Sequence, residues 1–186
     1  MCICYNTFMI LSLVKVPNLI LSKSAKKITR FDARLKQLIA DMQETLVASK
    51  DPEGVGLAAP QVGVCKQLFV TRAHKKAKLR SYINPVIIKT EEVVQTKTKE
   101  EDTAIFEGCL SIDRIWAPIT RPGKVLLKYQ NEKGRTEQKW FQGFEATIIQ
   151  HEVDHLNGVL FTQRAVEQDA EIYEEQHGKL KEIAVL

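Results

Sequence analysis

The segment His151-Glu152-Val153-Asp154-His155 constrains the fold more than any other part of the chain. On a helix, residues four apart project from the same face with their Cβ atoms about 5–6 Å apart. Two imidazoles at this spacing can share one divalent ion, and the glutamate between them can act on a bound water. The alternative is two unrelated histidines on an exposed helix, but the preceding residues 146–149 are largely apolar. We therefore expect a metal-binding helix over 144–157, with Gly158 as its C′ residue.

Composition limits the class of protein but does not identify a function. The chain has 186 residues, of which 44% are hydrophobic and 27% charged, and this composition argues against collagen-like and largely disordered chains. The net charge of +4 is spread along the chain and is too mild to indicate a nucleic-acid binder. No apolar run reaches the ~18–20 residues that would span a bilayer. We expect one domain over residues 1–186, with neither a membrane nor a specific nucleic acid as partner.

The first residues resemble neither a secretory signal nor a folded element. Residues 1–14 are apolar, but they lack a basic start and a small-residue cleavage site. Met9 opens a more usual beginning, so residues 1–8 are expected to be an N-terminal extension, with Cys2 and Cys4 in a frayed terminus. Cys65 is expected to be a small buried hydrophobic residue.

Apolar periodicity and turn residues predict the remaining elements. A helix is expected over about 30–49, with Thr29 as its N-cap and Asp32 near the positive end of its dipole. Strands are expected within 66–141, and this stretch is punctuated by Gly and Pro. They include 67–71, 79–88 and 125–129.

Two polar insertions and the C-terminal region complete the layout. Residues 72–80, with five basic side chains, and 90–102 are expected to be exposed loops. A third helix is expected over 166–181, within a C-terminal helical tail over 165–186. Strands first and helices last indicate an α+β fold.

Two histidines do not complete a metal site, so a third ligand is needed. The pattern continues like that of a metzincin protease, but Phe161 stands where that family needs its last histidine. In a zinc metallopeptidase of gluzincin type, a downstream glutamate such as Glu174 or Glu175 would serve. The other candidate is Cys109, which lies between a glycine and a Leu-Ser pair. A thiolate with two imidazoles leaves the fourth tetrahedral position open to water, as in a catalytic site.

Three motifs occur in one order along the chain: Gly54-Val55-Gly56-Leu57-Ala58-Ala59-Pro60-Gln61, then Glu107-Gly108-Cys109-Leu110-Ser111, then Gln150 to His155. Together they resemble peptide deformylase, the enzyme that removes the formyl group from the N-terminal methionine of nascent polypeptides and releases formate. The likeness covers most of the chain, from about Leu13 to Phe161. It implies an α+β fold with antiparallel sheets around a central metal-binding helix.

The resemblance also implies a role for each matching residue. Cys109, His151 and His155 would hold one divalent metal, Fe²⁺ in many members, with Zn²⁺, Ni²⁺ or Co²⁺ able to replace it. The metal would acidify a bound water, and Glu152 would take its proton and deliver it to the departing amine. The Gln61 side chain and the Leu110 backbone N–H would form an oxyanion hole.

Further matching positions concern the substrate and the support of the ligands. The backbone of Gly56 would hold the substrate amide, and the methionine pocket would be lined by Val55, Phe144, Thr147 and Ile148. Ordinary core packing is an equal alternative for these four. Since a ligating imidazole normally donates its other N–H to a carboxylate or carbonyl, we expect Asp154, braced by Arg121, to help fix the ligand helix.

The sequence departs from the family pattern at two places. Trp116 stands where some relatives have arginine, in a segment that borders the substrate cleft, so preference beyond methionine stays open. Residues 165–186 hold six acidic and two basic side chains, a net charge of −4, whereas some bacterial members dock on the ribosome through a basic C-terminal helix. RNA phosphates would repel the acidic tail, so we expect weak or no docking by this route.

The implied function is a hydrolase of protein biosynthesis that acts on N-formylmethionyl peptides in the cytoplasm or an equivalent compartment. Two other classes stay open at this point. A metallopeptidase that uses Glu174 or Glu175 predicts that Cys109→Ser keeps its metal. A non-catalytic binder or structural metal module predicts that protein atoms fill all four coordination positions.

Overall fold

The computed structural model describes residues 8–92 and 106–183. Within these ranges the helices are α1 (Ala33–Ala48), α2 (Phe144–Leu156) and α3 (Phe161–Glu167), with short 3₁₀ turns at Leu19–Ser22 and Ala59–Val62. The strands are β1 (Gly56–Ala58), β2 (Leu68–Thr71), β3 (Arg80–Glu91), β4 (Phe106–Cys109), β5 (Ile112–Pro118), β6 (Lys124–Gln130), β7 (Thr136–Gln142), β8 (Ile172–Gln176) and β9 (Lys179–Ile183).

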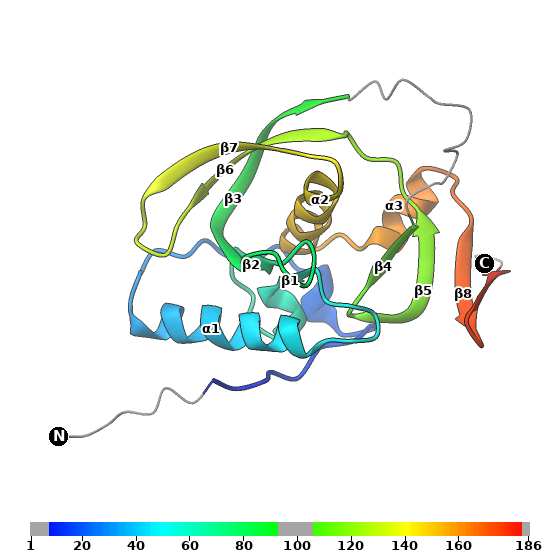
Figure 1. The fold of residues 1–186 in the computed structure, drawn as a ribbon, viewed down its shortest axis with the longest axis horizontal. Coiled ribbons are helices and arrows are strands. Elements are labelled where there is room, and N and C mark those ends of the chain that lie inside the picture. The colour runs from blue at the N-terminus through cyan, green and yellow to red at the C-terminus, as the bar shows by residue number, and fades with distance from the viewer. Residues whose placement is uncertain (1–7, 93–105, 184–186) are drawn as a thin grey trace.

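These strands form two antiparallel sheets. The larger has the order β1-β2-β3-β6-β7 and the smaller the order β4-β5-β8-β9. Helix α2 lies between the arching strands of the larger sheet and the smaller sheet (Figure 1). The expected α+β class with antiparallel sheets around a central helix is therefore confirmed. The single-domain boundary stays a prediction.

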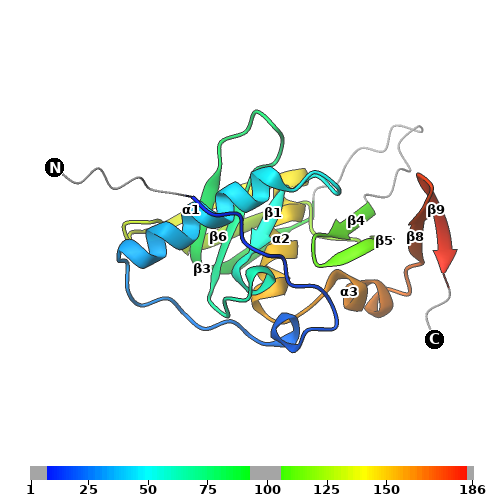
Figure 2. The same cartoon turned by 90° about the horizontal axis from the view of Figure 1, so that it is seen from below.

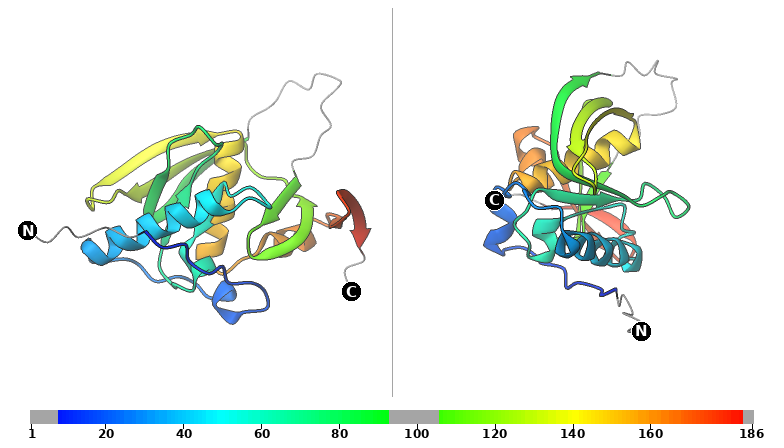
Figure 3. Two further views of the ribbon diagram at one scale, coloured as in Figure 1. Left: turned by 60° about the horizontal axis from the view of Figure 1, so that its bottom comes forward. Right: turned by 90° about the vertical axis from the view of Figure 1, so that its left-hand side faces the viewer.

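Strand β2 lies in the part of the larger sheet that is covered on both faces. Successive side chains of a strand point to opposite faces: Leu68 and Val70 join the core cluster that includes α1, whereas Phe69 joins the cluster that includes α2. All four residues of β2 are buried. The right-hand view in Figure 3 accordingly places α1 and α2 on opposite sides of this part of the sheet. The central helix is thus held from its apolar side by the sheet.

Helix α2 has the boundaries that its sequence predicts. Its buried residues Ala146, Ile149 and Leu156 pack into the core of the larger sheet. Asn157 is the C-cap, and Gly158 follows in the left-handed conformation with φ +75°, as expected for a C′ glycine.

The start of the first helix differs from the prediction. Asp32, not Thr29, is the N-cap: its carboxylate accepts the backbone N–H of Leu35 at 3.1 Å, and the helix begins at Ala33. A carboxylate serves as N-cap at least as well as a threonine hydroxyl, and at this position it also faces the positive end of the helix dipole.

The third helix and the C-terminal helical tail are wrong as predicted. Helix α3 covers only Phe161–Glu167, and residues 172–183 form the β8–β9 hairpin at the edge of the smaller sheet (Figure 2). His177 and Gly178 both have positive φ, 52° and 74°, which is the conformation that a two-residue hairpin turn requires. Strand β8 also pairs with β5, so tertiary pairing outweighs the helix propensity of the glutamates.

Smaller expectations have mixed outcomes. Thr90 and Glu91 belong to β3 rather than to the second loop, and the rest of that predicted loop from residue 93 lies outside the described residues. Cys2 and Cys4 also lie outside them. Cys65 is only half-buried. None of the described helices is long and apolar enough to cross a membrane.

Replacing Gly158 with alanine should destabilise the protein more than the same change at Gly178. Both glycines have a left-handed φ, +75° and +74°, so each substitution costs roughly 1–2 kcal/mol. A Cβ at Gly158 would also lie 2.6 Å from the backbone carbonyl carbon of Ser22, whereas a Cβ at Gly178 would meet nothing within 4 Å. We expect Gly158→Ala to lower the free energy of unfolding in urea by about 1–3 kcal/mol more than Gly178→Ala. Equal losses of unfolding free energy in the two variants would contradict this, because they would show that the backbone at Ser22 moves aside without cost.

Candidate metal centre

Strand β4 and helix α2 bring together Cys109, His151 and His155. One ligand atom from each of the three lies within 4.8 Å of the others. The Sγ of Cys109 is 3.2 Å from Nε2 of His155, and the ring centroids of His151 and His155 are 4.9 Å apart. Cys109 is 3% exposed and His155 only 1%. One thiol and two imidazoles, buried at this spacing, form a donor set that suits a divalent transition metal, so the residues present fit the expected ion.

Burial and neighbouring groups shift the pKa of three residues on helix α2: His151, Glu152 and His155. Burial lowers the pKa of His155 well below its usual value, and the neighbouring His151 adds to the effect. Burial also opposes protonation of His151, but hydrogen bonds to Cys109 and Glu107 raise its pKa well above the usual value. Burial raises the pKa of Glu152 to about 7. A carboxyl group with this pKa can both accept and donate a proton near neutral pH.

Glu152 is placed against the backbone of β1. A Cβ on Gly56 would lie 2.2 Å from Oε1 of Glu152, so only glycine leaves room for the carboxylate. Its other oxygen, Oε2, is buried and has no hydrogen-bond partner among the described residues. Since a buried polar atom without a partner is costly, this oxygen indicates a group that works on a molecule bound in the pocket.

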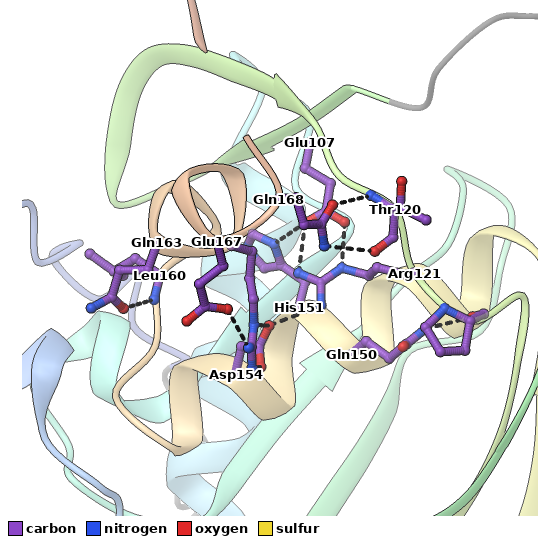
Figure 4. Close-up of polar contacts among 12 residues, drawn as sticks. Glu107, Thr120, Arg121, Gln150, His151, Asp154, Leu160, Gln163, Glu167 and Gln168 are labelled. Atoms are coloured by element: carbon purple, nitrogen blue, oxygen red, sulfur yellow. Dashed lines mark hydrogen bonds and ion pairs between the residues drawn. The ribbon is translucent and has the colours of Figure 1, made fainter. Parts of the chain in front are cut away.

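A buried chain of charges supports the ligand helix, and Figure 4 shows its central members. Nδ1 of His151 lies 3.0 Å from the Glu107 carboxylate. Arg121 binds Glu107 through two nitrogens, at 2.5 and 2.9 Å, and reaches Asp154 at 2.9 Å through a third. Although burial opposes ionisation of Glu107, hydrogen bonds from His151 and Arg121 lower its pKa. Arg121 and Asp154 thus form an ion pair, but the carboxylate that contacts the imidazole of His151 is that of Glu107.

Two residues near the end of α3 complete this support, and sequence reasoning missed both. Arg164 donates to both carboxylate oxygens of Asp154, at 2.7 and 3.2 Å. Gln168 accepts the backbone N–H of Thr120 at 2.8 Å and donates to its carbonyl at 3.0 Å (Figure 4). Helix α3 and its C-cap therefore bind both helix α2, which carries the histidines, and the segment that carries Arg121. Phe161, which stands where a metzincin needs its last histidine, is the first residue of this helix.

Gln61 points its amide nitrogen at the centre. Its Oε1 accepts the backbone N–H of Ala58 at 2.7 Å, which turns Nε2 toward Sγ of Cys109 at 3.4 Å and the Ser111 hydroxyl at 3.3 Å. The side chain is only 1% exposed. Leu110 follows Cys109 directly, and its carbonyl accepts the ammonium of Lys15 at 2.7 Å. Both predicted oxyanion residues therefore lie beside the three candidate ligands.

A cavity of about 270 Å³ opens onto the centre. His151, Glu152, Cys109 and Gln61 line it together with Leu110. All of the residues predicted for the substrate line the same cavity: Gly56, Val55, Phe144, Thr147 and Ile148. Ile148 is 4% exposed and Phe144 is 48% exposed, so the apolar part of the cavity is open at one end.

The glutamates of the protease alternative lie elsewhere. Glu174 and Glu175 are on β8, where Glu174 accepts the side-chain amide of Gln176 and Glu175 accepts the indole N–H of Trp116. Neither is part of the Cys-His-His group. The gluzincin prediction fails because the tail is a hairpin that pairs with β5 rather than a helix beside α2.

Comparisons with known proteins agree with this geometry. The sequence model of the polypeptide deformylase family matches residues 10–171. A peptide deformylase from Dictyoglomus thermophilum is 38% identical over 160 residues, which cover 86% of this chain and 95% of that relative.

Two solved structures have the same fold. The peptide deformylase from Synechococcus elongatus in complex with actinonin has a TM-score of 0.73 and 38% identity, and the match covers 83% of this chain and 79% of that one. The Acinetobacter baumannii enzyme with Met-Ala-Ser bound has a TM-score of 0.72 and 31% identity, over 85% of this chain and 99% of that one. The motifs, the fold and these matches all lead to one conclusion: the chain belongs to the polypeptide deformylase family.

Proposed function

We propose that this chain hydrolyses the formyl amide of N-formylmethionyl peptides, producing formate and a free amino terminus, with its own residues in the roles below. The observation that carries the proposal is the convergence of Cys109, His151 and His155 beside the buried Glu152, at the end of an apolar cavity. Nascent polypeptides are the proposed natural substrates, in the cytoplasm or an equivalent compartment that starts proteins with formyl-methionine.

Cys109, His151 and His155 are the proposed ligands of one divalent metal ion. Fe²⁺ is the proposed ion in the cell, and Zn²⁺, Ni²⁺ and Co²⁺ are the proposed substitutes, because thiolate and imidazole donors suit these ions. When bound, the metal supplies a water acidic enough to serve as a nucleophile at neutral pH. The contact of Glu107 with Nδ1 of His151 supports ligation of this histidine through Nε2, because it fixes the ring and its tautomer.

Glu152 is the proposed acid and base of the reaction. Its carboxylate takes the proton of the attacking water and delivers it to the amine that leaves when the formyl C–N bond breaks. The burial that raises its pKa to about 7 supports this role, since a group that both takes and returns a proton works best near the ambient pH.

Gln61 and Leu110 are proposed to stabilise the negative charge that develops on the formyl oxygen. The fixed amide of Gln61 presents N–H groups toward Cys109, and the backbone N–H of Leu110 is the second donor. Donors that are already oriented need not reorganise during the reaction, and removing one such donor from other enzymes costs about 10²–10³ in rate.

The methionine side chain is proposed to lie against Val55, Phe144, Thr147 and Ile148, which line the cavity beside Glu152. Gly56 then offers its backbone to the substrate amide. The related Acinetobacter baumannii structure holds Met-Ala-Ser, so formyl-Met-Ala-Ser is a suitable test substrate for this chain.

Glu152→Ala should abolish most of the hydrolysis of formyl-Met-Ala-Ser while the protein keeps its metal. Loss of a positioned acid and base lowers turnover by about 10²–10⁴-fold, whereas the three proposed ligands stay in place. The assay is formate release under anaerobic conditions, together with metal analysis of the same sample. Glu145→Ala is the matched control, because Glu145 is an exposed carboxylate in the first turn of the same helix. Full activity of Glu152→Ala would refute the assigned role.

Glu107→Gln should weaken metal binding, because it removes the charge that holds Nδ1 of His151 and two nitrogens of Arg121. Loss of such a partner typically costs 10–100-fold in affinity or activity. Competition of Zn²⁺ or Co²⁺ with a chelator measures the affinity. Glu91→Gln is the control, since Glu91 binds Lys89 and Lys124 away from the metal centre.

Asp154→Asn tests the outer part of the same chain of charges. We expect a smaller loss of metal affinity than for Glu107→Gln, since Asp154 binds Arg121, which in turn binds the Glu107 carboxylate that contacts His151. Full metal content and full turnover in Asp154→Asn would contradict its proposed role in fixing the ligand helix.

We also propose that the C-terminal region gives weak or no ribosome docking, because residues 165–186 carry a net charge of −4 and RNA phosphates repel them. Sedimentation with ribosomes at low and high salt measures this. The proposal would be wrong if the protein bound ribosomes in a salt-sensitive way and lost this binding in the variant Lys179→Gln/Lys181→Gln, which lacks the lysines of the region.

A further inference from the structure

The C-terminal hairpin contacts the wall of the substrate cavity through Trp116. Strand β8 pairs with β5 so that Trp116 lies opposite Tyr173. The indole N–H of Trp116 donates to the Glu175 carboxylate at 3.2 Å, and Nε of Arg114 donates to the Glu175 carbonyl at 2.8 Å. The indole ring also packs on the backbone next to Cys109, because a Cβ on Gly108 would lie 2.7 Å from it. The hairpin therefore fixes a side chain beside the metal centre.

Trp116 separates two cavities. On one side is the cavity of the metal centre, and on the other is a polar cavity of about 450 Å³. The two share Pro52, Gly108, Cys109 and Trp116 as walls. Glu175 lines only the polar cavity, and no residue of helix α2 reaches it. The polar cavity thus adjoins the centre on the side away from the helix.

This placement suits one particular residue of an extended peptide. Under the proposed function, the methionine side chain points toward α2, where Phe144, Thr147 and Ile148 lie. Successive side chains of an extended chain point in opposite directions. The side chain that follows methionine therefore points away from α2, which is the side of the polar cavity.

The charges of this cavity favour a cation. Its charged walls are Asp51, Asp113, Arg114 and Glu175. Asp113 is already paired with Lys15 at 2.5 Å. The ion pairs between described residues include neither Asp51 nor Glu175. Two carboxylates thus outweigh the one guanidinium, and the Trp116 ring offers a face that attracts cations.

We propose that Trp116 and Glu175 form a subsite for a basic side chain, lysine or arginine, at the residue after formyl-methionine. The subsite rests on the proposed deformylase function, and it gives the β8–β9 hairpin a part in substrate choice. Because this side chain lies away from the bond that breaks, the subsite acts on KM rather than on kcat.

The test compares formyl-Met-Lys-Ser with formyl-Met-Glu-Ser on the metal-loaded protein at low ionic strength. An exposed ion pair and a cation–π contact are each worth a few-fold in affinity, so we expect kcat/KM to favour the lysine peptide by about ten-fold, through KM. Glu175→Gln should reduce this ratio to about two. Glu174→Gln is the matched control, because its carboxylate binds Gln176 and does not line the cavity, and it should keep the ratio of the unmodified protein. Salt at about 0.5 M should also lower this kcat/KM ratio, because ions at that concentration screen exposed charges.

Three outcomes would overturn the subsite. The kcat/KM ratio of the two peptides could be near one in the unmodified protein, it could fall equally in Glu174→Gln and Glu175→Gln, or the preference for the lysine peptide could lie in kcat alone. Calorimetry with the unformylated peptides Met-Lys-Ser and Met-Glu-Ser gives a readout that needs no hydrolysis. If neither formyl peptide is cleaved but Met-Lys-Ser binds more tightly, the proposed function fails and the subsite stands. If both are cleaved equally and both products bind equally, the subsite alone fails.

Discussion

The guanidinium of Arg121 joins the two parts of the protein that must meet at the metal centre. It binds Glu107 on strand β4, two residues before Cys109, and Asp154 on helix α2, one residue before His155. Its side chain and both carboxylates are 10% exposed or less. Removing one member of a buried pair leaves an uncompensated charge, which costs roughly 3–5 kcal/mol in other proteins. The relative position of the thiol and the imidazoles therefore depends on this one side chain, on Arg164 of α3 and on Gln168, the C-cap of α3.

The two sheets contribute differently to the centre. The larger sheet buries α2 from its apolar side and supplies Gly56, whose missing side chain makes room for Glu152. The smaller sheet supplies Cys109 and, through Trp116, a wall of the substrate cavity. Helix α2 lies between them, so its histidines face the thiol while its apolar residues face the core. In this arrangement the larger sheet holds the helix, and strands β4 and β5 of the smaller sheet line the cavity at the metal centre.

Local patterns in the sequence predicted the ligand helix almost to the residue, because helix periodicity and a C′ glycine are short-range signals. The tail was predicted wrongly for the complementary reason: its glutamates favour a helix locally, and only pairing with β5 makes Ile172–Gln176 a strand. The contact of Glu107 with His151 is not predictable from the sequence, although Glu107 begins the motif that contains Cys109. A contact across 44 positions of the sequence leaves no local periodicity, and the nearby Asp154 was the more obvious carboxylate.

The sequence by itself determined which atoms are available for chemistry: a thiol, two imidazoles at helical spacing, a carboxyl group between them and an amide in a glycine-rich segment. The order of these motifs was enough to indicate the family. Only the tertiary structure decided what each group meets. It selected Cys109 over Glu174 and Glu175 as the partner of the histidines, brought the Gln61 amide nitrogen next to Cys109, and placed Glu175 beside Trp116. These are contacts between segments far apart in the chain or orientations set by packing, and neither leaves a periodic trace in the sequence.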